Sequence, residues 1–459
     1  MALQRNTRLE GLIKELRWSQ SGLAAAVRQV AAEMDAGDFL TITQPAVSHW
    51  VRGGTPSGEG PDIVCEALTR KAGRRVTRED AGFPPPKEST LQTQPEQDSD
   101  PLTVLAHLRE DMPGTIGRRS ILYSAFAATV PGQGWWDRRR ERARQRAPLT
   151  TLTVTAAHVE ALRDAAAYHS RQDQRLGGRA GRGALRYFLS TDVAAYLSGR
   201  PANDGVRLAL LSAAGHLAYL DGWTSFDAGE QGDAQRGFGL ALTLAAEAGD
   251  AALAGHILRA QAHQALDLGH RTAALRYADA SVDSSRYSAA VPRERALLGV
   301  VHGRALAAVG RKQDAMAALR RAERDLGAAD TARDEPDRVA FFAQASLAHE
   351  TGLALRALGD LKGAEEQLQH SARTRAASSA RTHAVTLGLL GGVQAQRGHI
   401  DEACDTWNTA LEAMTGIQSG RTRDIVLGMR SALSPIRARG GHVAAALDAR
   451  AREVLHAIG

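Results

Sequence analysis

The sequence predicts an all-α protein, because a helix-hairpin pattern recurs along its C-terminal half and no stretch alternates in the manner of a strand. Glycines recur at intervals of 39 to 49 residues, and each is followed five positions later by an alanine. The glycines are Gly229, Gly269, Gly310, Gly359, Gly398 and Gly440, and the alanines are Ala234, Ala274, Ala315, Ala364, Ala403 and Ala445. Each interval is long enough for two helices and two turns, so the pattern predicts stacked helix pairs.

Two more positions recur at a fixed spacing from these glycines. Seven residues before them lies a small residue in five of six cases: Gly222, Ala262, Gly303, Gly352 and Gly391, with Leu433 as the exception. Nine residues after them the side chain is apolar: Phe238, Ala278, Leu319, Leu368, Trp407 and Ala449. We expect each small residue where two antiparallel helices approach closely, with the apolar side chain filling the gap beside it.

This order of small residue, glycine, alanine and apolar residue resembles the tetratricopeptide repeat from about Arg207 to the C-terminus. The intervals exceed the family's usual length of about 34 residues, which predicts longer helices or looser turns. The resemblance implies a right-wound solenoid with a concave binding face. Residues 207–459 are therefore predicted to be a repeat domain for ligand sensing and dimerisation.

Composition narrows the function classes. A chain of 459 residues holds two or three domains, and its net charge of +6 is compatible with binding nucleic acid. With Cys65 and Cys404 as its only cysteines, neither a disulfide framework nor a cysteine zinc site is expected, and a reducing cytoplasm fits. No signal peptide or membrane-spanning run is predicted, so the expected location is cytoplasmic.

Residues 1–83 contain four helical patterns. Thr7 and Ser19 are the expected caps of the first two helices. The third spans Thr43–Arg52, with Val47, Trp50 and Val51 on its buried side, and the fourth spans about Asp62–Lys71.

The segments Trp18–Ala24 and Val47–Gly53 resemble the repressor-type (XRE/Cro) helix-turn-helix. The resemblance implies that the third helix enters the major groove, with Gln44, Ser48 and His49 reading bases and Arg52 on phosphate or base. Glutamine pairs bidentately with adenine, which suits this role. The full predicted DNA-binding set is Ser19, Gln20, Thr43, Gln44, Ser48, His49 and Arg52.

The chain between Leu23 and Thr43 is about two turns longer than a tight helix-turn-helix needs. Either the second helix extends to Met34, or Asp35–Ile42 forms a longer loop; similar extended versions look like actinobacterial regulators. Residues 1–83 hold 11 Lys and Arg against 10 Asp and Glu. This near-neutral balance favours binding as a homodimer, because two copies double the phosphate contacts.

The middle of the chain divides into a predicted flexible linker, 84–115, and a helical arginine-rich connector, 116–206. Trp135 and Trp136 precede the arginine-rich run 138–146. That run is either an auxiliary phosphate clamp or, as we favour, a solvated helix docked by its tryptophans. The glycine-rich stretch 177–183 lacks the ending of a phosphate-binding loop and is predicted to be a mobile loop. Residues 117–130 resemble a twin-arginine export signal, but their internal position favours a short joining helix.

The repeat register also nominates a ligand site. Positions six to thirteen residues before the turn glycines supply polar, aromatic and cationic side chains on the expected inner helices: His216, Tyr219, Trp223, His256, Arg259, His263, Arg304 and His349. Such a wall suits a peptide carboxylate or a flat acidic molecule, and its histidines predict pH sensitivity near neutrality. In the alternative interpretation, the aromatic residues are core and the histidines are ordinary polar surface.

No catalytic constellation is found, so we expect neither an enzyme nor a cofactor. His256 and His263 are two helical turns apart, which disfavours a metal site. The favoured prediction is a dimeric, DNA-binding transcription regulator that recognises a double-stranded operator and senses a small molecule or peptide. The domain order resembles that of the signal-peptide-sensing regulators of Gram-positive bacteria. The alternatives are a tetratricopeptide scaffold that binds proteins without DNA, and an exported protein.

Overall fold

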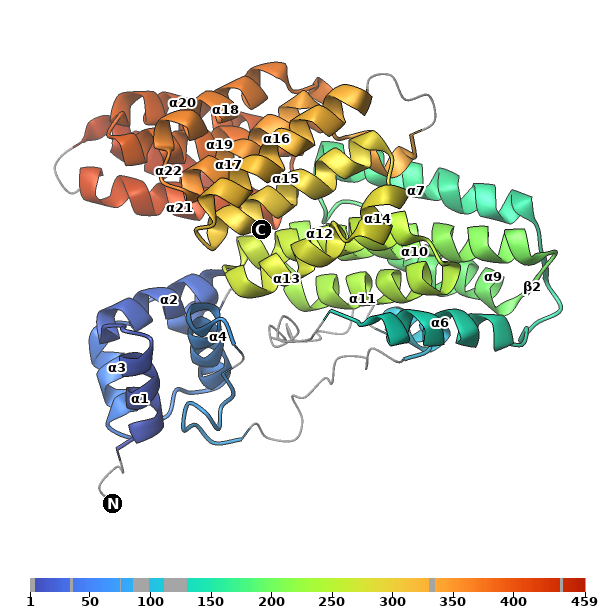
Figure 1. The fold of residues 1–459 in the computed structure, drawn as a ribbon. Helices are drawn as coiled ribbons and strands as arrows, with labels where there is room; N and C mark the ends of the chain where they lie inside the picture. The colour runs from blue at the N-terminus through green and yellow to red at the C-terminus, as the bar shows by residue number, and fades with distance from the viewer. Residues whose placement is uncertain are drawn as a thin grey trace. The chain divides into compact units, whose positions relative to one another are not determined.

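The computed structural model describes residues 5–33, 36–74, 76–85, 99–110, 130–329, 335–437 and 441–458. Over these residues the fold is all-α, as predicted, and the described strands are one parallel pair, β1 (Thr153–Val154) and β2 (Arg200–Pro201). Two compact units are present and are described separately. The first contains α1 to α4, and the second contains α5 to α22 apart from Ala265–Ala273 (Figure 1).

The first unit follows the predicted helix order closely. Its helices are α1 (Thr7–Glu15), α2 (Gln20–Glu33), the 3-10 turn η1 (Gly37–Phe39), α3 (Gln44–Val51) and α4 (Gly60–Ala72). Ser19 caps α2 as predicted, because its Oγ accepts from the Gly22 amide at 3.0 Å. The prediction that Thr7 caps α1 was wrong. The side chain of Asn6 caps this helix by accepting from the Leu9 amide at 2.9 Å, and Thr7 is the first helical residue.

The extra chain between α2 and α3 has features of both alternatives. α2 reaches Glu33, one residue short of Met34, which lies outside the described residues with Asp35. The 3-10 turn η1 lies within the predicted loop. The Phe39 ring is buried and packs so closely on Gly60 that a Cβ there would lie 2.4 Å from the ring. Arg28 of α2 donates to the Ile42 carbonyl at 2.5 Å, just before α3 begins. The insertion is therefore a packed support for α3.

The second unit begins with helices that precede the repeat. They are α5 (Pro101–Glu110), α6 (Gln133–Gln145), α7 (Ala156–Leu176), α8 (Arg182–Phe188), the π-helical turn η3 (Leu189–Val193) and α9 (Ala194–Ser198). α5 corrects the linker prediction for 84–115, because Leu105 and Leu108 are buried and the helix packs against η3 and α11. The remaining residues of that range, except 84, 85, 99 and 100, and the export-like residues 117–129 lie outside the described chain.

Helix hairpins form the rest of the second unit. Their bounds are α10 (Asp204–Asp227), α11 (Gln231–Ala248), α12 (Ala251–Asp267), α13 (Arg271–Ser281), α14 (Ser284–Ala289), α15 (Pro292–Ala308), α16 (Lys312–Ala329), η4 (Asp337–Val339), α17 (Gln344–Ala357), α18 (Leu361–Thr374), η5 (Ala377–Ser379), α19 (Ala380–Arg397), α20 (Ile400–Ala413), α21 (Gly420–Arg437) and α22 (His442–Ile458). The pairs α10 with α11, α15 with α16, α17 with α18 and α19 with α20 pack directly. Five of the six predicted turn glycines have φ between +81° and +87°, the left-handed conformation that ends a helix. The sixth, Gly440, lies outside the described residues.

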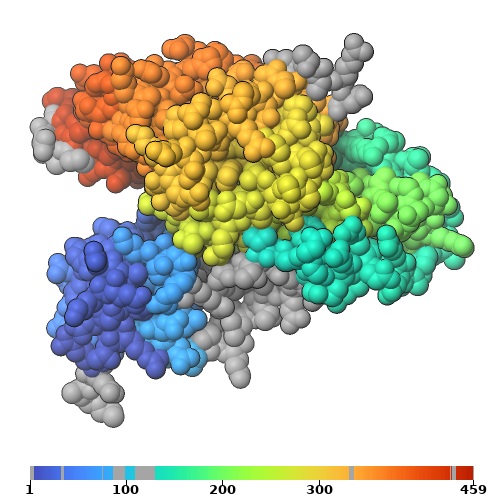
Figure 2. Space-filling view, in the orientation of Figure 1, coloured from blue at the N-terminus to red at the C-terminus, as the bar shows by residue number. Residues whose placement is uncertain are grey.

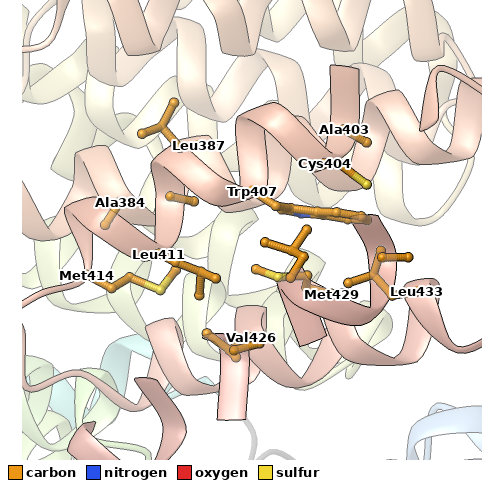
Figure 3. Packing of buried hydrophobic residues seen from close by; sticks show 14 of the residues in the cluster. Ala384, Leu387, Ala403, Cys404, Trp407, Leu411, Met414, Val426, Met429 and Leu433 are labelled. Carbon is orange, nitrogen blue, oxygen red and sulfur yellow. The ribbon is translucent and has the colours of Figure 1, made fainter. Parts of the chain in front are cut away.

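The predicted pairing of small and large residues is confirmed in four hairpins. A Cβ on Gly222 would lie 2.6 Å from the Phe238 ring, and one on Gly391 would lie 2.6 Å from Trp407. Gly303 meets Leu319 and Gly352 meets Leu368 in the same way, each at 2.9 Å. In the last hairpins Trp407 is 2% exposed, and Figure 3 shows side chains of α19, α20 and α21 around it. The helices therefore approach closely because one partner lacks a side chain.

Segments far apart in sequence close the second unit. α7 packs against both α10 and α19. A Cβ on the buried Gly420, at the start of α21, would lie 2.8 Å from the backbone of Ala228 and Gly229 beyond α10. The last helix pairs of the solenoid therefore touch the first.

The glycine-rich stretch 177–183 lies at this closure, which corrects the mobile-loop prediction. Gly177 and Gly178 are buried, and the Gly178 amide donates to Asp227 Oδ2 at 2.8 Å. A Cβ on Gly178 would lie 2.2 Å from the Thr224 carbonyl oxygen. Glycine is needed here because two backbones touch. Within the described part of the chain, no helix is both long enough and apolar enough to cross a membrane.

Candidate nucleic-acid interface and inner wall

The exposed side of α3 is polar. Gln44, His49 and Arg52 are exposed and Ser48 is half-buried; we call these four residues the α3 surface. The opposite side is apolar and buried, because Val47 is 0% exposed, and Trp50 and Val51 are buried beside it. Thr43, in extended backbone conformation, precedes the helix, and its side chain is exposed. The predicted division of α3 into two sides is confirmed.

The loop after α3 fixes one side chain of this surface. The His49 ring lies against Gly54, where a Cβ would come within 2.2 Å of Nε2. Any larger residue at Gly54 would therefore displace the imidazole. Arg52 Nε donates to the Ser48 carbonyl at 3.3 Å, and the side chain is exposed.

Ion pairing in the first unit leaves two exposed arginines without carboxylate partners among the described residues. Several arginines pair with carboxylates: Arg5 with Glu10, Arg8 with Glu79, Arg70 with Glu66, Arg74 with Glu15 and Arg78 with Asp62. By contrast, neither Arg52 nor Arg17 pairs with any carboxylate that the structure describes. Arg17 is exposed, has φ +51° and precedes Ser19 and Gln20, which belong to the predicted DNA-binding set. Unpaired guanidinium groups beside a polar helix surface suit contact with phosphates.

The eight predicted ligand residues, which we call the inner wall, lie together in the second unit. Tyr219 stacks with His216 and Trp223 at centroid distances of 6.1 and 6.4 Å. His256 and His263 of α12 meet the edges of Tyr219 and Trp223, at 4.6 and 5.5 Å. His216 is half-buried, whereas the other seven residues are buried. The register therefore identified residues that pack together, and the burial of Tyr219 and Trp223 agrees with the alternative in which they are core.

Most of the wall is paired with residues that the sequence reasoning missed. Arg338 donates to both oxygens of Glu294 at 2.7 and 2.8 Å, and His256 Nδ1 lies 3.1 Å from the same carboxylate. Arg259 donates to His256 Nε2 at 3.1 Å, and a guanidinium has no acceptor, so Nε2 must accept. The His256 proton therefore sits on Nδ1 and points to Glu294, which makes the ring neutral.

The other end of the wall is paired in the same way. Arg304 donates to Glu350 at 2.7 Å, and His263 lies 3.7 Å from that carboxylate. Thr386 donates its hydroxyl to the Thr382 carbonyl, so His349 Nδ1 must donate to Thr386 at 2.8 Å. This assigns a proton to His349 Nδ1.

Burial controls the charge states of these histidines. It lowers the pKa of His256 to about 4 and the pKa values of His216 and His349 to about 3. These groups therefore stay neutral at physiological pH, and the expected pH sensitivity near neutrality was wrong for these three. For Glu294, burial acts to raise the pKa, but hydrogen bonds from His256 and Arg338 outweigh it and lower the value to about 2.

A buried charge cluster joins the wall to the closure of the solenoid. Arg381 of α19 donates to Asp173 of α7 at 2.9 Å and to Asp227 of α10 at 2.8 Å. All three side chains are at most 2% exposed. Burial raises the pKa of Asp173 to about 6, against the opposing effect of Arg381. The sequence does not predict this cluster, because single acidic residues within helices do not indicate which arginine they pair with.

The arginine-rich helix α6 matches the docked alternative. Trp135 and Trp136 are both 8% exposed, and α6 packs along α11 at the surface of the second unit (Figures 1 and 2). Arg139 is buried and contacts the Ser99 carbonyl and Glu247. Arg138, Arg140 and Arg144 remain exposed.

One group of metal-ligand types occurs among the described residues. Glu365, His399 and Glu402 bring potential ligand atoms within 4.8 Å of one another. Arg397 pairs closely with Glu365, and Gln369 also donates to it at 3.2 Å. The guanidinium already neutralises this carboxylate, so we assign no metal to the group.

Residues 9–84 match the family model described as the SP15 N-terminal domain. The matched range runs from α1 to just beyond α4 and so contains the α3 surface. No curated protein and no solved structure matches the chain.

Proposed function

We propose that this protein is a DNA-binding transcription regulator whose first unit reads double-stranded DNA through the α3 surface. The observation that carries the proposal is the composition of α3, with one side buried and the other side exposing Gln44, Ser48, His49 and Arg52. These side chains are hydrogen-bond donors and acceptors of the kinds that read base edges and phosphates. The unpaired Arg17 and Arg52 add local positive charge to a unit that is nearly neutral overall.

The proposal includes a homodimer, because a single near-neutral unit makes few phosphate contacts. Two copies would bind a palindromic operator, with half-sites about one helical turn apart. The second unit would sense an effector through its inner wall. An effector that binds one conformation of this unit better than another would shift the DNA-binding equilibrium.

The test uses the full-length protein and a random-sequence duplex pool. Repeated selection is expected to enrich one palindromic sequence, and binding to it should weaken as salt increases. Gln44→Ala should weaken binding to the enriched duplex by about 5- to 150-fold and relax the preference at one base pair. Arg52→Ala should weaken binding to all duplexes and reduce the salt slope by about 1.

Lys14→Ala is the matched control, since Lys14 is an exposed cation of α1 outside the α3 surface. It should keep the affinity and preference of the unaltered protein. If no sequence is enriched, or if the three variants bind alike, the regulator proposal fails. Capture of protein partners without any DNA binding would support the scaffold alternative instead.

A further inference from the structure

Arg259 differs from the other interior arginines of the second unit in what neutralises it. Arg304, Arg338 and Arg381 each hydrogen-bond to a carboxylate, at 2.7 to 2.9 Å. Arg259 is 2% exposed and pairs with no carboxylate among the residues that the structure describes. A buried cation without a counter-charge is unfavourable, because desolvation is not repaid by an ion pair.

The partners of Arg259 are neutral. One terminal nitrogen donates to the Tyr219 hydroxyl at 2.9 Å and to His256 Nε2 at 3.1 Å, and the Nε–H has no hydrogen-bond partner. The guanidinium carbon lies 5.4 Å from the centre of the Trp223 ring and 5.9 Å from that of Tyr219. The rings stabilise the cation partly, but they leave one buried donor unsatisfied.

The two carboxylates that contact other wall residues already accept hydrogen bonds from arginines. Glu294 accepts from Arg338 and His256, and Glu350 accepts from Arg304. The residual exposure of the wall lies on either side of Arg259, since His216 is half-buried and Arg304 is 8% exposed. A ligand that pairs with Arg259 would have to bring its own negative charge.

We propose that the inner wall binds a small organic anion, whose carboxylate or phosphate group pairs with Arg259 beside Tyr219 and Trp223. This inference rests on the sensing role in the proposed function and specifies its ligand class. The neutral His256 leaves the guanidinium free to provide the charge, and the flat rings would contact the body of the ligand. A carboxylate or phosphate oxygen would also satisfy the orphaned Nε–H.

The experiment measures thermal unfolding of the full-length protein at constant ionic strength. The probes are benzoate, indole-3-acetate, citrate and inorganic phosphate, with benzamide and indole-3-acetamide as uncharged counterparts. At least one anion should raise the unfolding midpoint saturably by 2 °C or more, because a ligand that binds only the folded state stabilises it. The amides should cause no shift, and the active probes will distinguish a carboxylate ligand from a phosphate ligand.

Arg259→Gln should abolish the shift. Arg320→Gln is the control because Arg320 is exposed on α16, and it should keep the full shift. If Arg259→Gln does not fold, Arg259→Lys keeps a cation but loses the planar guanidinium; it should weaken the anion shift, and an unchanged shift in that variant would also overturn the inference. Equal shifts with an acid and its amide, no saturable shift with any anion, or an unchanged shift in folded Arg259→Gln would overturn the inference.

DNA binding measured on the same preparations separates the two proposals. Binding to the selected duplex without any anion effect would overturn only the anion site. A saturable anion effect without DNA binding would support the site and overturn the proposed regulator.

Discussion

The α3 surface and the inner wall use the same kinds of residue in opposite ways. On α3, glutamine, serine, histidine and arginine lie at the surface without ion-pair partners in the described chain. On the inner wall, the histidines and arginines other than the half-buried His216 are buried, and most of them contact a carboxylate or hydroxyl from another helix. The comparison teaches that a polar side chain keeps its binding capacity only where the fold leaves it unpaired. Arg259 combines the two cases. It is buried, as the rest of the wall is, but it has no carboxylate partner in the described chain, as is true of the residues of the α3 surface.

The largest expected effect concerns the buried charges. Arg381→Ala should lower the free energy of unfolding by about 3–5 kcal/mol, because Asp173 and Asp227 would remain buried without their cation. Urea unfolding of the full-length protein measures the loss. Arg320→Ala, on the exposed side of α16, should change the value by less than about 0.5 kcal/mol. A loss below about 1 kcal/mol for Arg381→Ala would remove the energetic distinction between the two regions.

The pH dependence of stability sharpens the same distinction. The folded pKa values of His256 and His349 are about 4 and about 3, whereas the unfolded chain takes up these protons near pH 6.5. Stability is therefore complete above pH 6.5 and falls toward pH 4, by about 1.4 kcal/mol per pH unit for each histidine. Asp173 partly offsets this loss of stability. Its pKa is raised to about 6 in the folded state, so as the pH falls the folded state binds this proton before the unfolded state does.

Urea unfolding midpoints at pH 7, 6 and 5 measure how stability depends on pH. His349→Gln should remove the contribution of one histidine to this dependence. A flat profile between pH 6.5 and 5 would contradict the assignment of neutral, buried histidines.

A smaller effect is expected from two adjacent glycines of α19. Gly391→Ala should destabilise the protein by about 1–3 kcal/mol, because the new Cβ would lie 2.6 Å from Trp407. Gly392→Ala meets no atom within 4 Å and should stabilise the helix by about 0.5–1 kcal/mol. Chemical unfolding of both variants provides the comparison, and effects of the same sign would contradict the close-packing explanation.

The sequence was sufficient for patterns that depend on local spacing. Positions such as Gly391 and Trp407, which recur in register, predicted the hairpins and their contacts, and Val47 and Trp50 predicted the buried side of α3. The partners of the inner wall could not be predicted, because Glu294 and Glu350 come from other helix pairs whose relative rotation is a tertiary property. The same holds for Gly178, whose close contact with Thr224 depends on how the solenoid closes.

That closure, where Gly420 meets the backbone of Ala228 and Gly229, changes how the repeats depend on one another. In an open repeat array, terminal repeats can be deleted because each repeat packs only against its neighbours. In this unit the last helices also pack against the first hairpin. Deleting the last hairpin would therefore remove contacts that stabilise the first. We therefore expect shortened versions of this unit to be less stable than the intact unit.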